Sequence, residues 1–319
     1  MNDESIQPHR HDLGAATAAK PDARLAVSLA LNLLITLAQL VGGLIANSLG
    51  LLSDAAHNLS DVVALGLSLM AVRLGRRTAT DRHTYAYKRA EILVALFNSA
   101  VLIAISAYII VKAAQRLADP AEVKGLWVVA FAGGGLLINS ICALLLRSHG
   151  EDLNLRSAFL HLVGDAFTSL GVIVSGLVVY LWDWNYADAI ISILVSLWIG
   201  REALAIVKST VNVLMEGTPE GVDYRQVEAA MLRIPGVRGV HDLHIWALSS
   251  SERALSAHMQ VEDATLSETT AVLTAAKRLL AEEFRIGHAT LELETEDGTC
   301  AGSTCAEPTP EPPHTGDRH

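Results

Sequence analysis

The chain has 319 residues, of which 51% are hydrophobic and only 18% are charged. Soluble globular domains carry about 25% charged residues, so this composition excludes an ordinary soluble protein and indicates an integral membrane protein. The net charge of −10 arises mainly from the acidic last third of the chain, and the lack of a basic domain argues against nucleic-acid binding.

Six apolar runs follow a polar segment at the start of the chain. A run of about 20 apolar residues is long enough to cross the hydrocarbon core of a bilayer as a helix. The sequence therefore predicts six transmembrane helices, at residues 25–46, 50–73, 91–113, 125–147, 157–181 and 186–208. Together they form a six-transmembrane-helix bundle over residues 25–212, a membrane all-α domain preceded by a cytoplasmic N-terminal segment at residues 1–24. No cleavable signal peptide is expected, because the first apolar run is itself long enough to span.

The loop between the second and third runs predicts the orientation. It is rich in arginine and lysine (RLGRRTATDRHTYAYKR), whereas the first and fifth connections, NSLG and WDWNYAD, contain neither. Basic residues gather in cytoplasmic loops. We therefore expect this loop on the cytoplasmic side and, with an even number of spans, both termini there as well.

Two pairs of ionisable residues lie inside the predicted spans. His57 and Asp61, in the HNLSD motif of the second run, are four residues apart and so share one helix face. His161 and Asp165, in the HLVGD motif of the fifth run, repeat this spacing. Ionisable residues are costly in hydrocarbon and usually mark function. If the two helices face each other, two imidazoles and two carboxylates supply the four ligands of a tetrahedral Zn²⁺ site.

A single pair of this kind is more often a hydrogen-bonded structural feature, but its repetition at identical spacing favours the metal site. Two nitrogen and two oxygen ligands suit a borderline divalent ion better than Mg²⁺ or Ca²⁺. Asp54, three residues before His57, lies near the same helix face. Two interpretations of Asp54 stay open: a group that supports or feeds the site, and an ordinary polar residue near the outer membrane surface.

After residue 212 charged residues become frequent, and no later run could span. Helical spacing and strand alternation predict helices at residues 223–234 and 266–284 and strands at 237–248, 254–262 and 289–294. The order α-β-β-α-β predicts a C-terminal cytoplasmic ferredoxin-like α+β domain without its first strand, over residues 213–295. Residues 296–319 are rich in Pro, Thr, Gly and Glu, and we expect a disordered tail.

These features resemble the cation diffusion facilitator family, most of all its bacterial zinc, cadmium and cobalt resistance branch and the eukaryotic zinc transporters. The matching pieces lie within residues 20–295: six spans with cytoplasmic termini, HNLSD, HLVGD, TYAYKRAEILVALFN entering the third span, and HDLHIW opening the soluble domain. The resemblance implies a homodimer in the lipid bilayer of the bacterial inner membrane that exports divalent metal, with zinc as the transported substrate and protons as the coupling ion. It also implies that His57, Asp61, His161 and Asp165 form the transport site.

Protons and metal compete for such ligands. A ligating histidine must be neutral and a ligating aspartate ionised, so metal entry releases protons and arriving protons weaken the site. A small tilt of one set of helices against another would then open the site to one side at a time, as in other secondary carriers.

The resemblance suggests a second site in the basic loop, where some family members bind metal with one aspartate and two histidines. Asp81 and His83 are present, but Tyr87 stands where the second histidine is expected, and two protein ligands rarely make a tight zinc site. Near this loop, Arg89 and Glu216 are predicted to form a salt bridge that links the membrane and cytoplasmic parts. The alternative is that Arg89 only satisfies the positive-inside rule.

A third site is suggested in the cytoplasmic domain. The resemblance brings His241 and His258 towards Glu292 or Glu294, which share one strand face because strand side chains alternate. These residues would bind zinc as a regulatory ligand at or near a dimer interface. The alternative is that they are surface polar residues of a small sandwich.

Two other functions fit the sequence less well than metal export. An intramembrane zinc hydrolase needs an open coordination position and a general base, and the sequence contains no HExxH motif. The presence of both His-x-x-x-Asp pairs argues against a metal sensor that has lost transport. Within export, Cd²⁺, Co²⁺, Ni²⁺, Mn²⁺ and Fe²⁺ stay alternative substrates, because selectivity among such ions is geometric.

Overall fold

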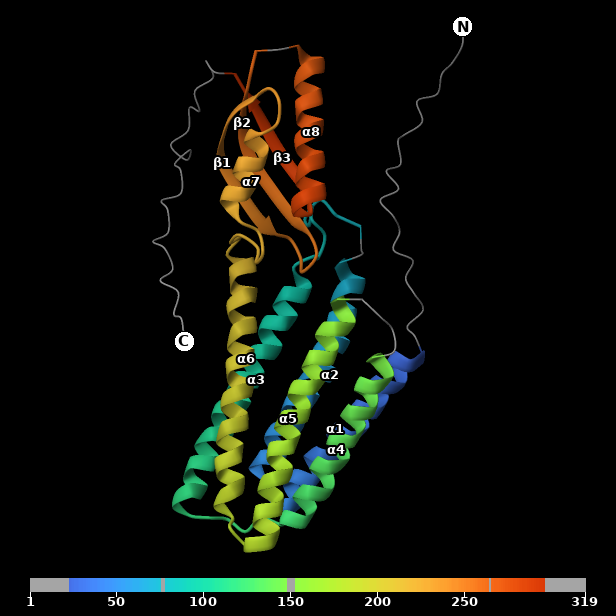
Figure 1. Cartoon of the computed structure of the whole chain (residues 1–319), viewed down its shortest axis with the longest axis vertical. Coiled ribbons are helices and arrows are strands. Elements are labelled where there is room, and N and C mark those ends of the chain that lie inside the picture. The colour runs from blue at the N-terminus through green and yellow to red at the C-terminus, as the bar shows by residue number, and fades with distance from the viewer. Residues whose placement is uncertain (1–22, 76–77, 148–152, 264, 296–319) are drawn as a thin grey trace. The chain divides into compact units, whose positions relative to one another are not determined.

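The computed structural model describes residues 23–75, 78–147, 153–263 and 265–295 (Figure 1). The expected tail, and the expected N-terminal segment apart from its last two residues, lie outside these described residues. The chain divides into two compact units: a first unit of Met1–Val62 with Ile105–Leu197, and a second unit of Val63–Ala104 with Trp198–His319.

Six long helices precede the sheet in the described part of the chain. They are α1 (Ala23–Ala46), α2 (Leu49–Gly75), α3 (Ala90–Ala118), α4 (Gly125–Arg147), α5 (Leu153–Trp182) and α6 (Tyr186–Leu214). By length and apolar composition, α3, α6 and the stretch Gly164–Trp182 of α5 can cross a membrane. The described apolar stretches of α1 and α4 are shorter, and α2 is interrupted by polar and ionisable residues. The prediction of six spans is thus supported for three helices and stays a prediction for the other three.

In the first unit, α4 packs against both α1 and α5 (Figure 1). A Cβ atom added at Gly125 would lie 2.5 Å from the carbonyl oxygen of Gly176, so only small residues permit this approach of α4 and α5. The buried apolar core between the helices includes Leu51, Val128 and Val172, each 0% exposed. Many large apolar side chains are exposed on the outer faces of the helices, as contact with lipid tails allows.

A buried carboxyl group joins the start of α2 to the start of α6. Asp188, in the first turn of α6, accepts hydrogen bonds from the hydroxyl of Ser48 at 2.5 Å and the backbone N–H of Leu49 at 2.9 Å. Arg116 of α3 places Nη1 3.7 Å from the same carboxyl group. A carboxylate at a helix N-terminus satisfies N–H groups that lack a partner within the helix. Asp188 therefore fixes the first turn of α2, the helix of the HNLSD motif.

The second unit contains a three-stranded sheet and two covering helices. Its elements follow in the order predicted from the sequence: α7 (Tyr224–Leu232), β1 (Val237–Ala247), β2 (Arg253–Val261), α8 (Leu266–Phe284) and β3 (Ile286–Glu294). The central strand β2 is antiparallel to β1 and parallel to β3. Because α7 contacts β1, α8 contacts β3 and the two helices contact each other, they cover one face of the sheet around a buried core that includes Met231, Leu255, Met259 and Leu280.

Local signals set the limits of these two helices. The side chain of Asp223 accepts a hydrogen bond from the backbone N–H of Arg225 at 2.8 Å and caps α7. Thr265 and Glu268 form a capping box at the start of α8. The hydroxyl and the backbone N–H of Thr265 donate to the carboxylate of Glu268, and these hydrogen bonds lower the pKa of Glu268. Arg285, with a φ of 56°, ends α8 in the left-handed conformation typical of helix ends.

Candidate metal sites

Three of the four residues predicted for the transport site converge in the first unit. His57 and Asp61 of α2 and Asp165 of α5 each offer a ligand atom, and these atoms all lie within 4.8 Å of one another. Nε2 of His57 is 3.3 Å from Oδ1 of Asp165 and 3.7 Å from Oδ2 of Asp61. His161 lies on α5 one helical turn before Asp165. The side chain of His161 is outside the described part of the chain.

The spacing of these atoms suits a tetrahedral ion. Ligand atoms about 2.1 Å from a tetrahedral Zn²⁺ lie roughly 3.4 Å from one another. The two distances from His57, 3.3 and 3.7 Å, are close to this value, so a single ion can contact all three groups after small side-chain adjustments. Two carboxylates also balance the charge of a dication, which reduces the cost of holding it among apolar helices.

Asp54 lies beside this cluster but has different partners. It is 0% exposed, and its carboxyl group accepts hydrogen bonds from Gln39 of α1 and from Thr168 and Ser169 of α5, each at 3.0 Å. Sequence reasoning singled out Asp54 but missed its three partners. The available signal was an uncharged polar residue, Gln39, inside an apolar run, because buried polar groups in a membrane need partners.

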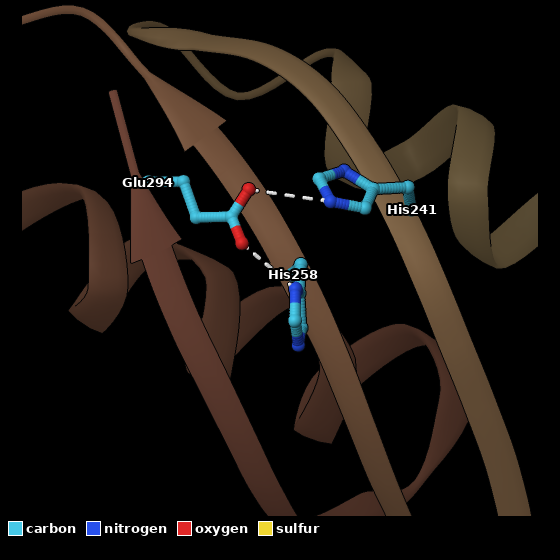
Figure 2. Close-up of side chains that lie close together, drawn as sticks. All are labelled: His241, His258 and Glu294. Atoms are coloured by element: carbon cyan, nitrogen blue, oxygen red, sulfur yellow. Dashed lines mark ion pairs between the residues drawn. The ribbon is translucent and has the colours of Figure 1, made fainter. Parts of the chain in front are cut away.

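A second cluster lies on the sheet of the second unit and is formed by His241 of β1, His258 of β2 and Glu294 of β3 (Figure 2). Oε1 of Glu294 is 2.8 Å from Nδ1 of His258, and Oε2 is 3.2 Å from Nε2 of His241. The two imidazole rings stand at 68° to each other with centroids 5.2 Å apart. The carboxylate thus faces both rings, and three protein ligands suit a borderline divalent ion.

The two glutamates proposed from the sequence have different positions. Glu292 is opposite His258 in the strand register, yet its Oε2 is 3.6 Å from Nε2 of His258 and its side chain is 68% exposed. The side chain of Glu294 is only 11% exposed. No described residue donates a hydrogen bond to the buried Oε2 of Glu294. This oxygen therefore keeps lone pairs that a metal ion can use.

The basic loop offers less for metal binding. Asp81 and His83 are both exposed and belong to no group of three ligands within the described residues. The ring of Tyr87 stacks on His83 with centroids 4.5 Å apart, in the position where a second histidine was expected. Nearby, Arg89 donates to Glu216 at 2.9 Å, as predicted for the junction. The side chain of Arg89 is 34% exposed and that of Glu216 is 64% exposed, so water screens the pair and it contributes at most about 1 kcal/mol.

Comparison with known proteins identifies the family. A family model described as the cation efflux transmembrane domain matches residues 25–215, and one described as the cation efflux protein cytoplasmic domain matches residues 219–296. The chain belongs to the cation diffusion facilitator family. As a member of the cation diffusion facilitators it is a multi-pass membrane protein that transports metal cations, and it is not an enzyme.

Curated cation diffusion facilitators are similar over most of their length. The metal cation efflux system protein CzcD of Cupriavidus metallidurans is 39% identical over 85% of both chains. The cadmium, cobalt and zinc/H(+)-K(+) antiporter of Bacillus subtilis is 38% identical over 80% of this chain and 83% of its own. The zinc transporter ZitB of Escherichia coli is 37% identical over 84% of this chain and 85% of its own. A solved metal-bound C-terminal domain of the CzcD transporter is 42% identical, covers 23% of this chain and 99% of its own, and has a TM-score of 0.22.

Proposed function

We propose that this protein exports divalent metal ions, Zn²⁺ first among them, from the cytoplasm in exchange for protons. The observation that carries the proposal is the convergence of His57 and Asp61 of α2 with Asp165 of α5 in the first unit. Relatives named as a cadmium, cobalt and zinc antiporter and as a zinc transporter support the choice of substrate. Cd²⁺, Co²⁺, Ni²⁺, Mn²⁺ and Fe²⁺ are the alternative substrates, because they bind similar ligands.

The proposed transport site consists of His57, Asp61, His161 and Asp165. We assign His161 as the fourth ligand because it precedes Asp165 by one helical turn and so shares its helix face. Two neutral imidazoles and two carboxylates complete a tetrahedral shell, and the site carries no net charge once Zn²⁺ is bound. Each ligand must lose its proton to bind metal, so proton binding and metal binding exclude each other. This competition is the physical basis of the proposed exchange.

The exposure of the site indicates one side of access. The side chain of Asp61 is 33% exposed, whereas those of His57 and Asp165 are each 7% exposed. Asp61 therefore lies at the accessible end of the site. The orientation expected from the basic loop makes this the cytoplasmic side, where Zn²⁺ enters. Alternating access then requires closure at this end and opening at the other.

We propose the same architecture that the sequence predicts. Six spans at residues 25–212 cross a bacterial inner membrane, and both termini are cytoplasmic. A cytoplasmic segment at residues 1–24 precedes the spans, and a cytoplasmic domain at residues 213–295 follows them. A ferredoxin-like sandwich without its first strand accounts for the parallel pairing of β2 and β3, since the missing strand lies between these two in the complete fold. The protein acts as a homodimer, with lipid and divalent ions but no nucleic acid as its partners. Residues 296–319 follow as a disordered tail.

We also propose that His241, His258 and Glu294 bind regulatory Zn²⁺ in the cytoplasmic domain. Their donor set and spacing fit the ion, and no described residue donates a hydrogen bond to Oε2 of Glu294. Bound zinc would cross-link β1, β2 and β3. Glu292, on the same strand face, is the alternative carboxylate. The loop pair Asp81 and His83 would hold a metal ion only weakly, because a third ligand is lacking among the described residues.

Zinc flux into proteoliposomes under an imposed pH gradient tests the transport site. Asp61→Ala and Asp165→Ala are each expected to abolish zinc transport, because each removes a ligand. Asp183→Asn is the matched control, since Asp183 is an exposed carboxylate outside the site. Parental flux in both alanine variants would contradict the assignment of the site. Flux that ignored the pH gradient would contradict proton exchange, and faster transport of Cd²⁺ or Co²⁺ than of Zn²⁺ would change the substrate.

A further inference from the structure

One buried carboxyl group has no place in the proposed metal shell. Asp54 is 0% exposed and lies three residues before His57, on the helix face that also includes Asp61. Oδ1 of Asp54 accepts a hydrogen bond from Thr168, and Oδ2 accepts hydrogen bonds from Gln39 and Ser169. Both oxygens are therefore occupied by donors. A metal ion at Asp54 would have to displace three hydrogen bonds, which makes Asp54 a poor ligand.

The partners of Asp54 lie on two other helices. Gln39 belongs to α1, and Thr168 and Ser169 belong to α5, three and four residues beyond Asp165. On α2 the step from His57 to Asp54 leads towards the α1–α2 connection. These hydrogen bonds thus join three helices in a layer one turn away from the transport site, on the side opposite Asp61.

This layer is closed by further packing. Gln39 Oε1 accepts a hydrogen bond from Asn58 at 3.2 Å, which fixes the amide that donates to Asp54. A Cβ atom added at Gly135 of α4 would lie only 2.3 Å from Nε2 of Gln39, so α4 presses against the same amide. One turn further along α2, Leu51 is 0% exposed within an apolar core. Solvent exposure along this face of α2 therefore falls from Asp61 towards the α1–α2 connection and reaches zero at Asp54 and Leu51.

Thr168 connects this layer to the transport site. Its hydroxyl oxygen lies 3.0 Å from Asp54 Oδ1 and 2.9 Å from the backbone carbonyl oxygen of Asp165. A hydroxyl group has one proton to donate. The proton is therefore shared between the carboxyl group on α2 and the helix that holds a metal ligand. A change in the spacing of α2 and α5 can move this proton from one acceptor to the other.

We propose that Asp54, Gln39, Thr168 and Ser169 form a polar latch that keeps the transport site closed on the side of the α1–α2 connection. The inference rests on the proposed function, since it assigns the latch to one gate of the same carrier. Asp54 is a positioning residue: it holds α1, α2 and α5 together while metal is bound from the other side. Release of the ion towards the α1–α2 connection requires these hydrogen bonds to break. Individual hydrogen bonds inside membrane proteins are weak enough for this during a transport cycle.

A cysteine at residue 51 reports the state of the latch. Leu51→Cys is introduced into the full chain with Cys142, Cys300 and Cys305 replaced by serine, and the protein is reconstituted into proteoliposomes. The rate of reaction with a membrane-impermeant thiol reagent is measured with the reagent on the side of the α1–α2 connection. Asp54→Asn replaces one acceptor oxygen by an N–H₂ group, which cannot accept a hydrogen bond from the three donors around it. This variant is expected to raise the labelling rate about tenfold. Ser169→Ala removes one neutral donor and is expected to raise it about threefold.

Two controls separate the latch from a general loss of structure. Ser175→Ala removes another buried hydroxyl of α5, and should leave the rate unchanged, because within the described residues this hydroxyl donates only to the carbonyl of Val172 in its own helix. Zinc binding by the purified full chain provides the second readout. Asp54→Asn should bind zinc within about twofold of the parent, because each hydrogen bond of the latch contributes little to the metal shell itself.

The outcomes are distinct. Unchanged labelling in both Asp54→Asn and Ser169→Ala would overturn the latch, and so would equal acceleration in Ser175→Ala. Loss of zinc binding in Asp54→Asn would overturn it as well, by making Asp54 a ligand. Failure of the proposed function has a separate signature, which is parental zinc binding in Asp61→Ala, whatever the labelling rates are.

Discussion

Replacing Asp165 by asparagine should weaken zinc binding more than the same change at Asp61. The side chain of Asp165 is 7% exposed and its oxygen is 3.3 Å from His57, whereas that of Asp61 is 33% exposed and its oxygen is 3.7 Å away. Water screens the charge of the more exposed Asp61, so the more deeply buried carboxylate of Asp165 attracts a dication more strongly. Loss of a group that merely supports a metal ligand lowers affinity about 10–100-fold. We therefore expect a loss of about 100-fold or more for Asp165→Asn and a smaller loss for Asp61→Asn.

The measurement is an equilibrium zinc titration of the purified full chain at several pH values. Zinc affinity of the parent should fall as the pH falls, because protons compete for the same ligands. Each asparagine variant has one ligand fewer that can take up a proton, so its affinity should depend less steeply on pH. Asp183→Asn should match the parent. Equal zinc affinity in the parent and in Asp165→Asn, or a larger loss in Asp61→Asn, would refute the reasoning.

Two further variants test the cytoplasmic cluster and the packing of the first unit. Glu294→Gln should reduce the number of zinc ions bound per chain by one. Glu292→Gln should leave this number unchanged, because the side chain of Glu292 is 68% exposed. The reverse result would assign the site to Glu292. Asp188→Ala leaves Arg116 without its buried partner and should destabilise the protein by about 3–5 kcal/mol. A drop on the order of 10 °C in the thermal midpoint is expected. An unchanged midpoint would show that Asp188 does not anchor α2.

The sequence predicts which residues share a helix face but not which helix lies opposite. Spacing alone places His57 and Asp61 on one face of α2 and makes Asp165 a partner only if α5 faces it. The partners of Asp54 could not be found in this way, because Gln39 and Ser169 carry no charge and belong to no repeated motif. Only the packing of α1, α2 and α5 brings these three side chains together.

The cytoplasmic cluster shows a similar limit for strands. Alternation places Glu292 and Glu294 on one face of β3 but does not choose between them. The register pairs His258 with Glu292, and yet Glu294 makes the shorter contact, at 2.8 Å. Side chains lean along the strand direction, so the residue opposite is not always the nearest partner. Burial then separates the two glutamates, and burial depends on tertiary packing rather than on alternation.

Asp54 and Asp61, two carboxyl groups on one face of α2, differ in what surrounds them, and we propose that this difference limits the path of the metal ion. Asp61 is partly exposed, so water can replace an ion that leaves it. Asp54 has three donors and no exposure, and a zinc ion there would take the acceptor from Gln39 and Ser169 and leave Thr168 with only the backbone carbonyl of Asp165. Unpaired buried donors cost about 1–3 kcal/mol each. We therefore expect an ion that enters past Asp61 to be most stable beside His57 and to advance only when the helices separate.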